Sequence, residues 1–504
     1  MSISRRGFCR LASGSTFALL LSTGCASAPR ESDGLPRARP ESQGIDPAAI
    51  LAFLDEVAAA GLELHGLMIA RGGAVVAEGW WWPYRADRPH MMHSLTKSVT
   101  ACGVGLAIVE GRFALDDKVV SFFPDELPAQ IDDNLAAMSV RDLLTMQHGH
   151  ESEVSGAVWR PIKTSWVAEF FKIPVVHQPG TTFVYSSAAS FMLSAIVTKT
   201  TGQTLRDYLD PRLFRPLGIR PPSWDVGPGG INSGGNGLSW TTADSLKLGM
   251  LHIQDGVWQG DRVLPAAWVR EATRTQVPEA AYGYHWRRGP GDIFFGSGQF
   301  TQLVIGFPSH EAAMAVTAAI VDRELLLPIV WKHFPAAFVG PLANREPSAV
   351  ELRDRLANAR LLPPARRSSS PLMATISGRS FRAEPNPDGI EAVAFRFEDG
   401  ECLFTMRDGR GEHRVRAGLG AWIEGDTSMT GNKLHHQYQP DRMRVAAAGQ
   451  WLDDHSFEMT WQFVETAFRD RVLCRFDGSR LALDRSVNMN SADTAMPTLR
   501  AVMV

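Results

Sequence analysis

The sequence predicts an α+β protein in which an antiparallel sheet flanked by helices is followed by an all-β domain. Residues 64–80 read as two apolar strands, and residues 292–307 and 312–321 read as two more, with helical patterns between the two groups. Strands at both ends of a region with helices between them favour one sheet in which the first and last strands meet. Short alternating segments after residue 371 predict a separate β-barrel or β-sandwich.

The composition is typical of a soluble globular protein with more than one domain. The chain has 504 residues, of which 44% are hydrophobic and 21% charged, and a formal net charge of −3. This length favours roughly two to four domains. Because the chain carries no long basic or acidic run, nucleic acid is not an expected partner.

Residues 1–28 have the pattern of an export signal. Arg5 and Arg6 form a charged head, a short apolar segment runs to Leu21, and small residues follow. Residues 4–8 resemble a twin-arginine signal, which predicts an exported, periplasmic protein. The alternative is an anchor that stays in the membrane, although the apolar segment is shorter than the roughly 20 residues that a spanning helix needs.

The end of this signal also resembles a lipoprotein cleavage box. The stretch Leu-Ser-Thr-Gly-Cys ends at Cys25, with Ser22 where such a box prefers leucine. A lipid on Cys25 is therefore a hypothesis, and it is the one route by which we predict membrane attachment. The intact mass of the protein in the membrane fraction, with and without Cys25→Ala, tests it.

Three cysteines lie beyond the signal, namely Cys102, Cys402 and Cys474. An odd number of widely spaced cysteines does not make a disulfide framework. Either Cys402 and Cys474 form one bridge, or the thiols are free and buried.

The elements of the first unit can be followed along the chain. The two strands in 64–80 are joined by a glycine turn at residues 71–73. Helical periodicity follows from about Ser94 to Glu110, and Gly111 stands where a helix C-cap favours positive φ. A glycine-rich loop spans residues 228–237 and lacks the Lys-Ser/Thr ending of a phosphate loop, so we interpret it as a loop at the edge of the site.

These patterns predict the domain boundaries. We expect the first domain to span residues 29–345 and a linker to follow over residues 346–371, which contain a polar helical stretch and then a Pro, Arg and Ser-rich segment. The β domain is predicted over residues 372–488. Residues 489–504 read as a poorly ordered, flexible tail.

Ser94 and Lys97 lie three residues apart in an apolar stretch that looks helical. Positions i and i+3 share one face of a helix, so the lysine amine can reach the serine hydroxyl. A buried amine loses its proton more readily and can then activate a neighbouring serine, which is otherwise a poor nucleophile. Ser94 at the helix start also places a developing oxyanion near free N–H groups. The alternative is an N-cap serine beside a surface lysine.

Two further segments carry chemistry-bearing residues. Residues 178–187 place Tyr185 and two hydroxyls just before a helical run, where a tyrosine can transfer a proton. The alternative for Tyr185 is a buried core tyrosine. Residues 294–303 place glycines inside a strand, which weakens the strand unless another backbone or a ligand must approach closely.

Together these three segments resemble the serine β-lactamase and penicillin-binding-protein-like superfamily, particularly its class C, esterase and 6-aminohexanoate-dimer-hydrolase-like branch. The S-x-x-K motif is matched by Ser94 to Lys97, and Y-x-N by Tyr185 to Ser187. The third motif, K-T-G or H-x-G, is matched loosely by Gly296 to Gly298. The resemblance covers about residues 45–339 and implies a β-lactamase/transpeptidase-like sheet with a helical subdomain.

The resemblance also implies roles for individual residues. Ser94 would be the acylated nucleophile, Lys97 its general base and Tyr185 the group that exchanges protons with the leaving group and the deacylating water. The backbone N–H groups of Ser94 and Gln299 would form the oxyanion hole. It implies neither a metal nor an organic cofactor. The residues that would line the oxyanion and substrate site are Ser187, Gly296, Ser297, Gly298 and Gln299.

Two departures from the family pattern bear on the substrate. Ser187 stands where the motif has asparagine, which removes an amide that would hold a substrate carbonyl. Gly296 stands where the motif has lysine or histidine, and a cation there favours a substrate carboxylate. These departures argue against a good β-lactamase or DD-peptidase and favour small uncharged esters, or amides lacking that carboxylate.

The predicted function is therefore an exported serine hydrolase that cleaves an ester or amide through an acyl-enzyme on Ser94. Two alternatives stay open. One is a penicillin-recognising DD-carboxypeptidase or β-lactamase. The other is a non-catalytic protein that keeps the fold to bind cell-wall material. His148 and His150 invite a metal interpretation, but no ligand cluster with suitable spacing supports it, and they fit better in a loop beside the pocket.

Overall fold

The computed structural model describes residues 33–154, 156–340, 342, 346–361, 363, 367–429, 433–435 and 440–504. The predicted export signal over residues 1–28, with the lipidation candidate Cys25, lies outside the described residues. Export and lipidation therefore stay predictions.

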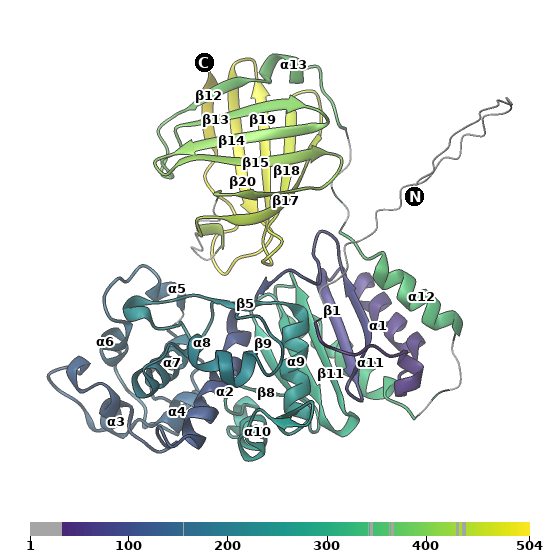
Figure 1. The fold of residues 1–504 in the computed structure, drawn as a ribbon. Helices are drawn as coiled ribbons and strands as arrows, with labels where there is room; N and C mark the ends of the chain where they lie inside the picture. Colours follow the sequence, from purple (N-terminus) through teal and green to yellow (C-terminus); the bar gives the residue numbers. More distant parts are fainter. Residues whose placement is uncertain are drawn as a thin grey trace, which may run out of the picture. The chain divides into compact units, whose positions relative to one another are not determined.

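The first domain is built on an antiparallel sheet with strand order β2-β1-β11-β10-β9-β8 (Figure 1). Its first and last long strands meet, because β1 pairs along its length with β11. The prediction of an α+β fold whose terminal strands share one sheet is confirmed. The strands are β1 (Leu64–Arg71), β2 (Ala74–Trp80), β8 (Arg287–Arg288), β9 (Phe294–Gly298), β10 (Gln302–Phe307) and β11 (Ala312–Ala318).

The single long strand predicted over residues 292–307 is wrong, because the chain turns back within it. Strands β9 and β10 pair antiparallel, with Gly298 opposite Gln302. Between them Phe300 and Thr301 adopt φ of 60° and 68°, the left-handed region that residues other than glycine rarely occupy. Phe300 is also buried, and a buried aromatic at the centre of a turn is not the glycine or asparagine that usually occupies the left-handed region.

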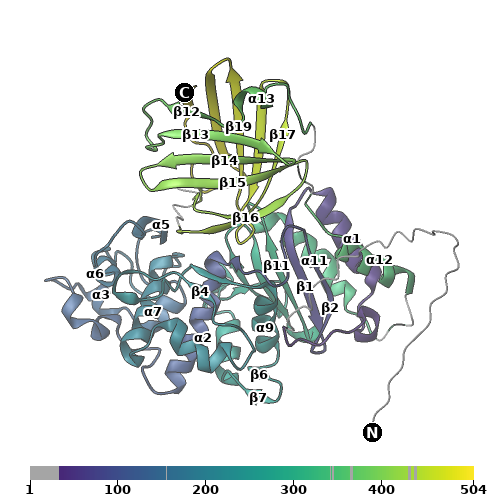
Figure 2. The ribbon, with the colours of Figure 1, turned by 45° about the horizontal axis from the view of Figure 1, so that its top comes forward.

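Helices cover both faces of this sheet (Figures 1 and 2). On one face lie α1 (Pro47–Ala59), α11 (Leu327–Ala337) and α12 (Glu346–Ala357), which share an apolar core with the sheet. On the other face α9 (Thr242–Ile253) packs along β1, β10 and β11, and α2 (Thr96–Val109) contacts β9.

Helix α12 corrects the predicted linker over residues 346–371. Leu352 and Leu356 are buried in the core of the first domain, and Leu356 packs directly on Gly79 of β2, where an added Cβ would lie 2.8 Å from the leucine Cδ2. The prediction failed because α12 is otherwise polar, so its few apolar side chains did not stand out as a buried face. The described part of the connection to the second domain therefore begins after Ala357.

A helical subdomain lies beside the sheet, with α7 packed on α2. A small three-stranded sheet, with order β3-β5-β4, and a β6–β7 hairpin accompany these helices among the described residues. The elements are β3 (His90–Met91), α3 (Asp133–Ala137), α4 (Val140–Leu144), α5 (Gly156–Trp159), α6 (Trp166–Phe171), α7 (Ser187–Thr201), α8 (Leu205–Leu209), β4 (Ser223–Trp224), β5 (Leu238–Trp240), β6 (Val257–Trp258), β7 (Asp261–Arg262) and α10 (Ala266–Thr273).

The second domain is a closed barrel and not a sandwich (Figure 2). Its strands follow the order β15-β14-β13-β12-β21-β20-β19-β18-β17-β16, and a parallel pairing of β15 with β17 closes the ring. Aromatic side chains fill the interior. The elements are α13 (Met373–Ile376), β12 (Arg379–Ala383), β13 (Ala392–Glu398), β14 (Glu401–Asp408), β15 (Gly411–Leu419), β16 (Ile423–Thr427), β17 (Met443–Trp451), β18 (Ser456–Gln462), β19 (Arg469–Asp477), β20 (Arg480–Val487) and β21 (Leu499–Met503).

The predicted flexible tail over residues 489–504 is wrong, because β21 belongs to the barrel. It pairs with β20 on one side and β12 on the other, and Leu499 and Ala501 point into the apolar interior. A strand this short has little stability alone and gains it from two neighbours that are distant in sequence. The composition of the segment could not show those neighbours.

The cysteines Cys102, Cys402 and Cys474 are buried free thiols, so the alternative of a bridge between the last two is wrong. Burial disfavours the thiolate and raises the pKa of Cys102 to about 12. Within the ranges that the structure describes, no helix has both the length and the hydropathy required to cross a membrane.

Candidate active site

Ser94 lies in a 3₁₀ turn (His93–Leu95) that leads directly into α2. The Thr96 hydroxyl donates a hydrogen bond of 2.6 Å to the His93 carbonyl and closes this turn. Lys97 is one turn further on and only 2% exposed, whereas Ser94 is partly exposed. The Lys97 Nζ lies 3.1 Å from the Ser94 Oγ, so the predicted i, i+3 contact between these residues is present.

Three oxygen atoms surround the Lys97 amine. Besides the Ser94 Oγ, they are the Ser187 Oγ at 3.1 Å and the Gly235 carbonyl oxygen at 2.8 Å. A carbonyl oxygen can only accept a hydrogen bond, so one N–H of the amine is committed to Gly235. A neutral amine that also donates to Ser187 has its lone pair left for the Ser94 hydroxyl. The geometry therefore suits proton transfer from Ser94 to Lys97.

Gly235 is a site residue that sequence reasoning missed. The glycine-rich loop over residues 228–237 is more than an edge loop, because it presses against the start of α7. A Cβ added at Gly235 would lie 2.9 Å from the Ser187 carbonyl oxygen, and one at Gly234 would lie 2.4 Å from that of Ser190. Consecutive glycines in a loop were the available signal for such a close approach.

Tyr185 lies between two cationic side chains. The Lys97 Nζ is 4.7 Å from the centroid of its ring, and the guanidinium carbon of Arg287 is 5.2 Å from the same centroid. Burial alone would raise the pKa of Tyr185, but the charges of Lys97 and Arg287, with hydrogen bonding from Ser94, outweigh it and lower that pKa. The phenolate is therefore more accessible here than in an ordinary tyrosine.

His148 supports the segment that carries Tyr185, and the His150 ring packs beside His148 with centroids 4.4 Å apart. The His148 Nε2 donates a 2.9 Å hydrogen bond to the Val184 carbonyl, and the Val184 N–H donates to the Met146 carbonyl at 2.8 Å. Burial lowers the pKa of His148 to about 4 and that of His150 to about 3, so both imidazoles are neutral near pH 7. Among the described residues, no three His, Cys, Asp or Glu side chains gather as a metal-binding group.

Arg287 is a second residue that sequence reasoning missed. The glycine at position 296 suggested that the site lacks a cation for a substrate carboxylate. A cation nevertheless lies beside Tyr185, because Arg287 is on the neighbouring strand β8, opposite Phe295 of β9. Arg323 lies within electrostatic reach, since burial and then repulsion by Arg287 lower its pKa. The position of Arg287 beside the site follows from the pairing of β8 with β9, which the sequence alone does not show.

The glycines of β9 allow the strand to lie directly against the start of α2. A Cβ at Gly296 would lie 2.8 Å from the Ser98 Oγ, and one at Gly298 would lie 2.0 Å from the Met92 carbonyl oxygen. The close approach predicted for these glycines is therefore to another part of the chain. Ser297, which alternates with them along the strand, lies on the opposite face of β9, and Gln299 is exposed in the turn that follows.

Gly298→Ala should destabilise the fold more than Gly296→Ala. The added methyl group meets a backbone oxygen in the first variant, whereas in the second it meets a serine side chain and a valine methyl group, which can shift. We expect Gly298→Ala to lower the free energy of unfolding by about 1–3 kcal/mol, measured by urea denaturation. An equal loss in the two variants would contradict the close backbone approach.

A cavity of about 550 Å³ opens beside Ser187. Its wall mixes apolar and polar side chains, and the polar part includes an ion pair between Arg160 and Asp225, with 3.5 Å between nitrogen and oxygen. Ser187, whose Oγ lies 3.1 Å from the Lys97 Nζ, lines this cavity, whereas Ser94, Lys97 and Tyr185 are not among its lining residues. Its aromatic and aliphatic lining comprises Trp159, Ile162, Trp166, Ala188, Phe191 and Val226.

Comparisons with known proteins place the chain in a family. The beta-lactamase family model matches residues 54–325. The 6-aminohexanoate-dimer hydrolase of Paenarthrobacter ureafaciens is 27% identical over 246 residues, 44% of this chain and 62% of that protein. Esterase EstB of Burkholderia gladioli is 27% identical over 209 residues, 36% of this chain and 53% of that protein. The matched segments thus span less than two thirds of either relative.

Among solved structures, a putative 6-aminohexanoate-dimer hydrolase from Bacillus anthracis has a TM-score of 0.49 and 16% sequence identity, covering 60% of this chain and 86% of that one. The family model spans more than half of the chain and includes each of the three motif segments. The chain therefore belongs to the beta-lactamase family, within the serine β-lactamase and penicillin-binding-protein-like superfamily.

Proposed function

We propose that this protein hydrolyses an ester or amide bond through an acyl-enzyme on Ser94. The observation that carries the proposal is the placement of the Lys97 amine, which contacts the Ser94 hydroxyl while Ser187 and Gly235 take its other hydrogen bonds. Relatives named as an esterase and as a dimer hydrolase support the reaction class.

In the proposed acylation step, Lys97 reacts in its unprotonated form: the Ser94 Oγ attacks the substrate carbonyl carbon while its proton moves to the lysine amine. The bond to the leaving group then breaks as the Tyr185 hydroxyl gives that group its proton and becomes the phenolate. Water next attacks the acyl carbon and gives a proton to the Tyr185 phenolate. The bond between the acyl carbon and the Ser94 Oγ then breaks, the acid leaves, and Lys97 returns its proton to Ser94. The lowered pKa of Tyr185 suits this exchange of protons.

The proposed oxyanion hole uses the backbone N–H groups of Ser94 and Gln299. The direct contact of Gly298 with the Met92 carbonyl supports this assignment, since it brings the end of β9 against the turn that carries Ser94. Gly296 and Gly298 would thus shape the oxyanion site through close packing, and Ser187 would act through Lys97 and at the rim of the cavity.

Arg287 gives specific support to a second candidate, a penicillin-recognising DD-carboxypeptidase or β-lactamase. It supplies, beside Tyr185, a cation that can bind a substrate carboxylate despite glycine at position 296. A stable penicillin adduct on Ser94, detected by mass spectrometry, would favour this candidate. Turnover of neutral esters without such an adduct would favour the ester or amide hydrolase.

The proposed function is tested by labelling the protein with a fluorophosphonate and locating the adduct by peptide mass spectrometry. We expect one adduct on Ser94, absent in Ser94→Ala and retained in Ser121→Ala, whose serine is exposed elsewhere in the same domain. A protein that keeps the fold only for binding would remain unlabelled, and this result would contradict the proposal.

Arg287→Met should move the acidic limb of the kcat profile to higher pH. The Arg287 charge helps to lower the pKa of Tyr185, so its removal raises that pKa and confines the phenolate to more alkaline solution. Measurement of kcat against pH with p-nitrophenyl butyrate checks this. Arg288→Met is the control, because this adjacent arginine donates to the Thr273 and Asp292 carbonyls instead. An unchanged limb in Arg287→Met would count against Tyr185 as the titrating group.

A further inference from the structure

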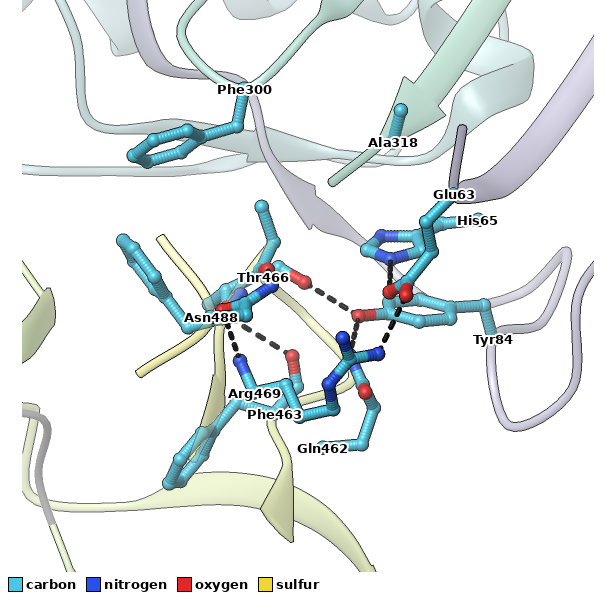
Figure 3. A network of polar contacts seen from close by, with 12 residues as sticks. Glu63, His65, Tyr84, Phe300, Ala318, Gln462, Phe463, Thr466, Arg469 and Asn488 are labelled. Atoms are coloured by element: carbon cyan, nitrogen blue, oxygen red, sulfur yellow. Dashed lines mark hydrogen bonds and ion pairs between the residues drawn. The ribbon is translucent and has the colours of Figure 1, made fainter. Parts of the chain in front are cut away.

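The barrel reaches the first domain through the turn between β18 and β19, residues 463–468. Figure 3 shows its polar contacts: Gln462 donates to the Tyr84 hydroxyl at 2.6 Å, and that hydroxyl donates to the Thr466 carbonyl at 2.8 Å. The Met91 N–H donates to the Glu465 carbonyl at 2.8 Å, three residues before Ser94. The turn is therefore tied by its backbone to the segment that carries the proposed nucleophile.

A partly buried ion pair anchors the same contact. Arg469 of β19 pairs with Glu63 at 2.6 Å, and the Glu63 carboxylate lies 3.1 Å from the His65 Nε2 (Figure 3). The His65 ring stacks on Tyr84 with centroids 3.6 Å apart. Burial alone would raise the pKa of Glu63, but His65 and Arg469 lower it to about 2, so the carboxylate stays charged near neutral pH.

At the end of this turn, one barrel side chain contacts two residues of the first domain. The centroid of the Phe468 ring lies 5.5 Å from that of Phe300 and 6.2 Å from that of His93, both edge to face. The rings of His93 and Phe300 are themselves 5.4 Å apart. Phe300 is buried within the apolar core of the barrel, although it belongs to the β9–β10 turn.

His93 and Phe300 flank the two proposed oxyanion donors. His93 directly precedes Ser94, and Phe300 directly follows Gln299. Both residues have positive φ, 48° and 60°, a conformation that costs a residue with a side chain on the order of 1 kcal/mol and persists where surrounding packing holds it. The packing that holds these two side chains includes the same phenyl ring of the barrel.

Resting on the proposed function, we propose that Phe468 is a positioning residue for acylation. Its ring holds His93 and Phe300 in their left-handed conformations and so keeps the N–H groups of Ser94 and Gln299 converged on one point. The barrel thereby forms part of the active site, and the contact with its turn is what the oxyanion geometry requires. Because aromatic side chains fill the barrel interior, we expect the barrel to act through its end and this turn.

The test compares Phe468→Ala with Phe404→Ala in the full chain. Phe404 is equally buried and packs on Phe395 and Trp461 inside the barrel, so its loss weakens the same domain elsewhere. The backbone contacts of Glu465 and Thr466 do not involve the Phe468 ring, so the barrel can remain in contact. Each variant is measured in two ways: by kinetics with p-nitrophenyl butyrate and by hydrogen exchange of residues 91–95 and 298–302. If Phe468→Ala does not fold, Phe468→Leu replaces it.

We expect Phe468→Ala to lower kcat by roughly 10- to 100-fold with little change in KM, because misplaced oxyanion donors weaken transition-state binding. Exchange in the two segments should quicken in this variant alone. Equal kcat losses in Phe468→Ala and Phe404→Ala, or unchanged exchange in both segments, would overturn the inference. Hydrogen exchange can be measured without turnover. An inactive wild-type protein would therefore contradict the proposed function, and the exchange rates of the two segments would still test the role of Phe468.

Discussion

Ser94→Ala should lower kcat for p-nitrophenyl butyrate by roughly 10⁴-fold or more, because it removes the atom that forms the acyl-enzyme. Residual rate would come from substrate binding and the oxyanion donors alone. The substitution leaves the backbone N–H of Ser94 in place and removes one partly exposed hydroxyl, so the fold should be little changed. Steady-state kinetics and a thermal melt of the same preparation separate these effects.

Ser121→Ala is the matched control for that experiment, since its exposed hydroxyl donates only to the nearby Lys118 carbonyl. It should retain wild-type turnover. If Ser94→Ala kept near-normal kcat, the hydrolysis would have to use another nucleophile, and the assignment of Ser94 would be wrong.

Lys97→Met should lower kcat by roughly 10²- to 10⁴-fold, the range expected for loss of a general base. Methionine fills nearly the same volume but cannot take the Ser94 proton. It also leaves the Gly235 carbonyl without the Lys97 donor, which should reduce the free energy of unfolding by about 1–3 kcal/mol. A substrate with a better leaving group should not restore the lost rate, because Ser94 would still lack its proton acceptor.

Lys247 provides an unusually close control for this variant. Its side chain is 1% exposed, its Nζ donates to the Gly218 carbonyl at 3.1 Å, and it lies 3.9 Å from an Asp244 carboxylate oxygen, so Lys247→Met also removes a buried amine from a carbonyl. We expect Lys247→Met to lose at least as much stability as Lys97→Met, and only Lys97→Met to lose kcat. Similar kcat losses in both would show that buried lysines act through stability alone.

Local patterns were sufficient where neighbours in sequence are also neighbours in space. The hairpin of β1 and β2 follows from two apolar runs on either side of a glycine turn, and it spans residues 64–80 as predicted, with Arg71 in β1 and not in the turn. The contact of Lys97 with Ser94 follows from the spacing of the two residues at a helix start. Gly111, at φ of 70°, likewise ends α2 as expected.

Patterns failed where the deciding partner is distant in the chain. The turn at Phe300 was missed because a buried aromatic in the left-handed region has no local signature, and its packing partner Phe468 is in the other domain. Residues 489–504 read as a tail because the two neighbours of β21, β12 and β20, are distant in sequence. Residues 346–357 read as part of a linker because the two leucines that α12 buries stand in an otherwise polar stretch.

The sequence by itself determined the reaction class that we propose, the identity of Ser94, Lys97 and Tyr185 as its candidate residues, and the order of a helix-flanked sheet and an all-β domain. Only the tertiary structure decided what surrounds those residues. It supplied Gly235 as the acceptor that orients the amine, Arg287 as the cation beside Tyr185, and Phe468 as the contact from the barrel. The spacing of a motif shows which residues lie close to a reactive group along the chain. The electrostatic and steric surroundings of that group come from segments that meet only when the chain folds.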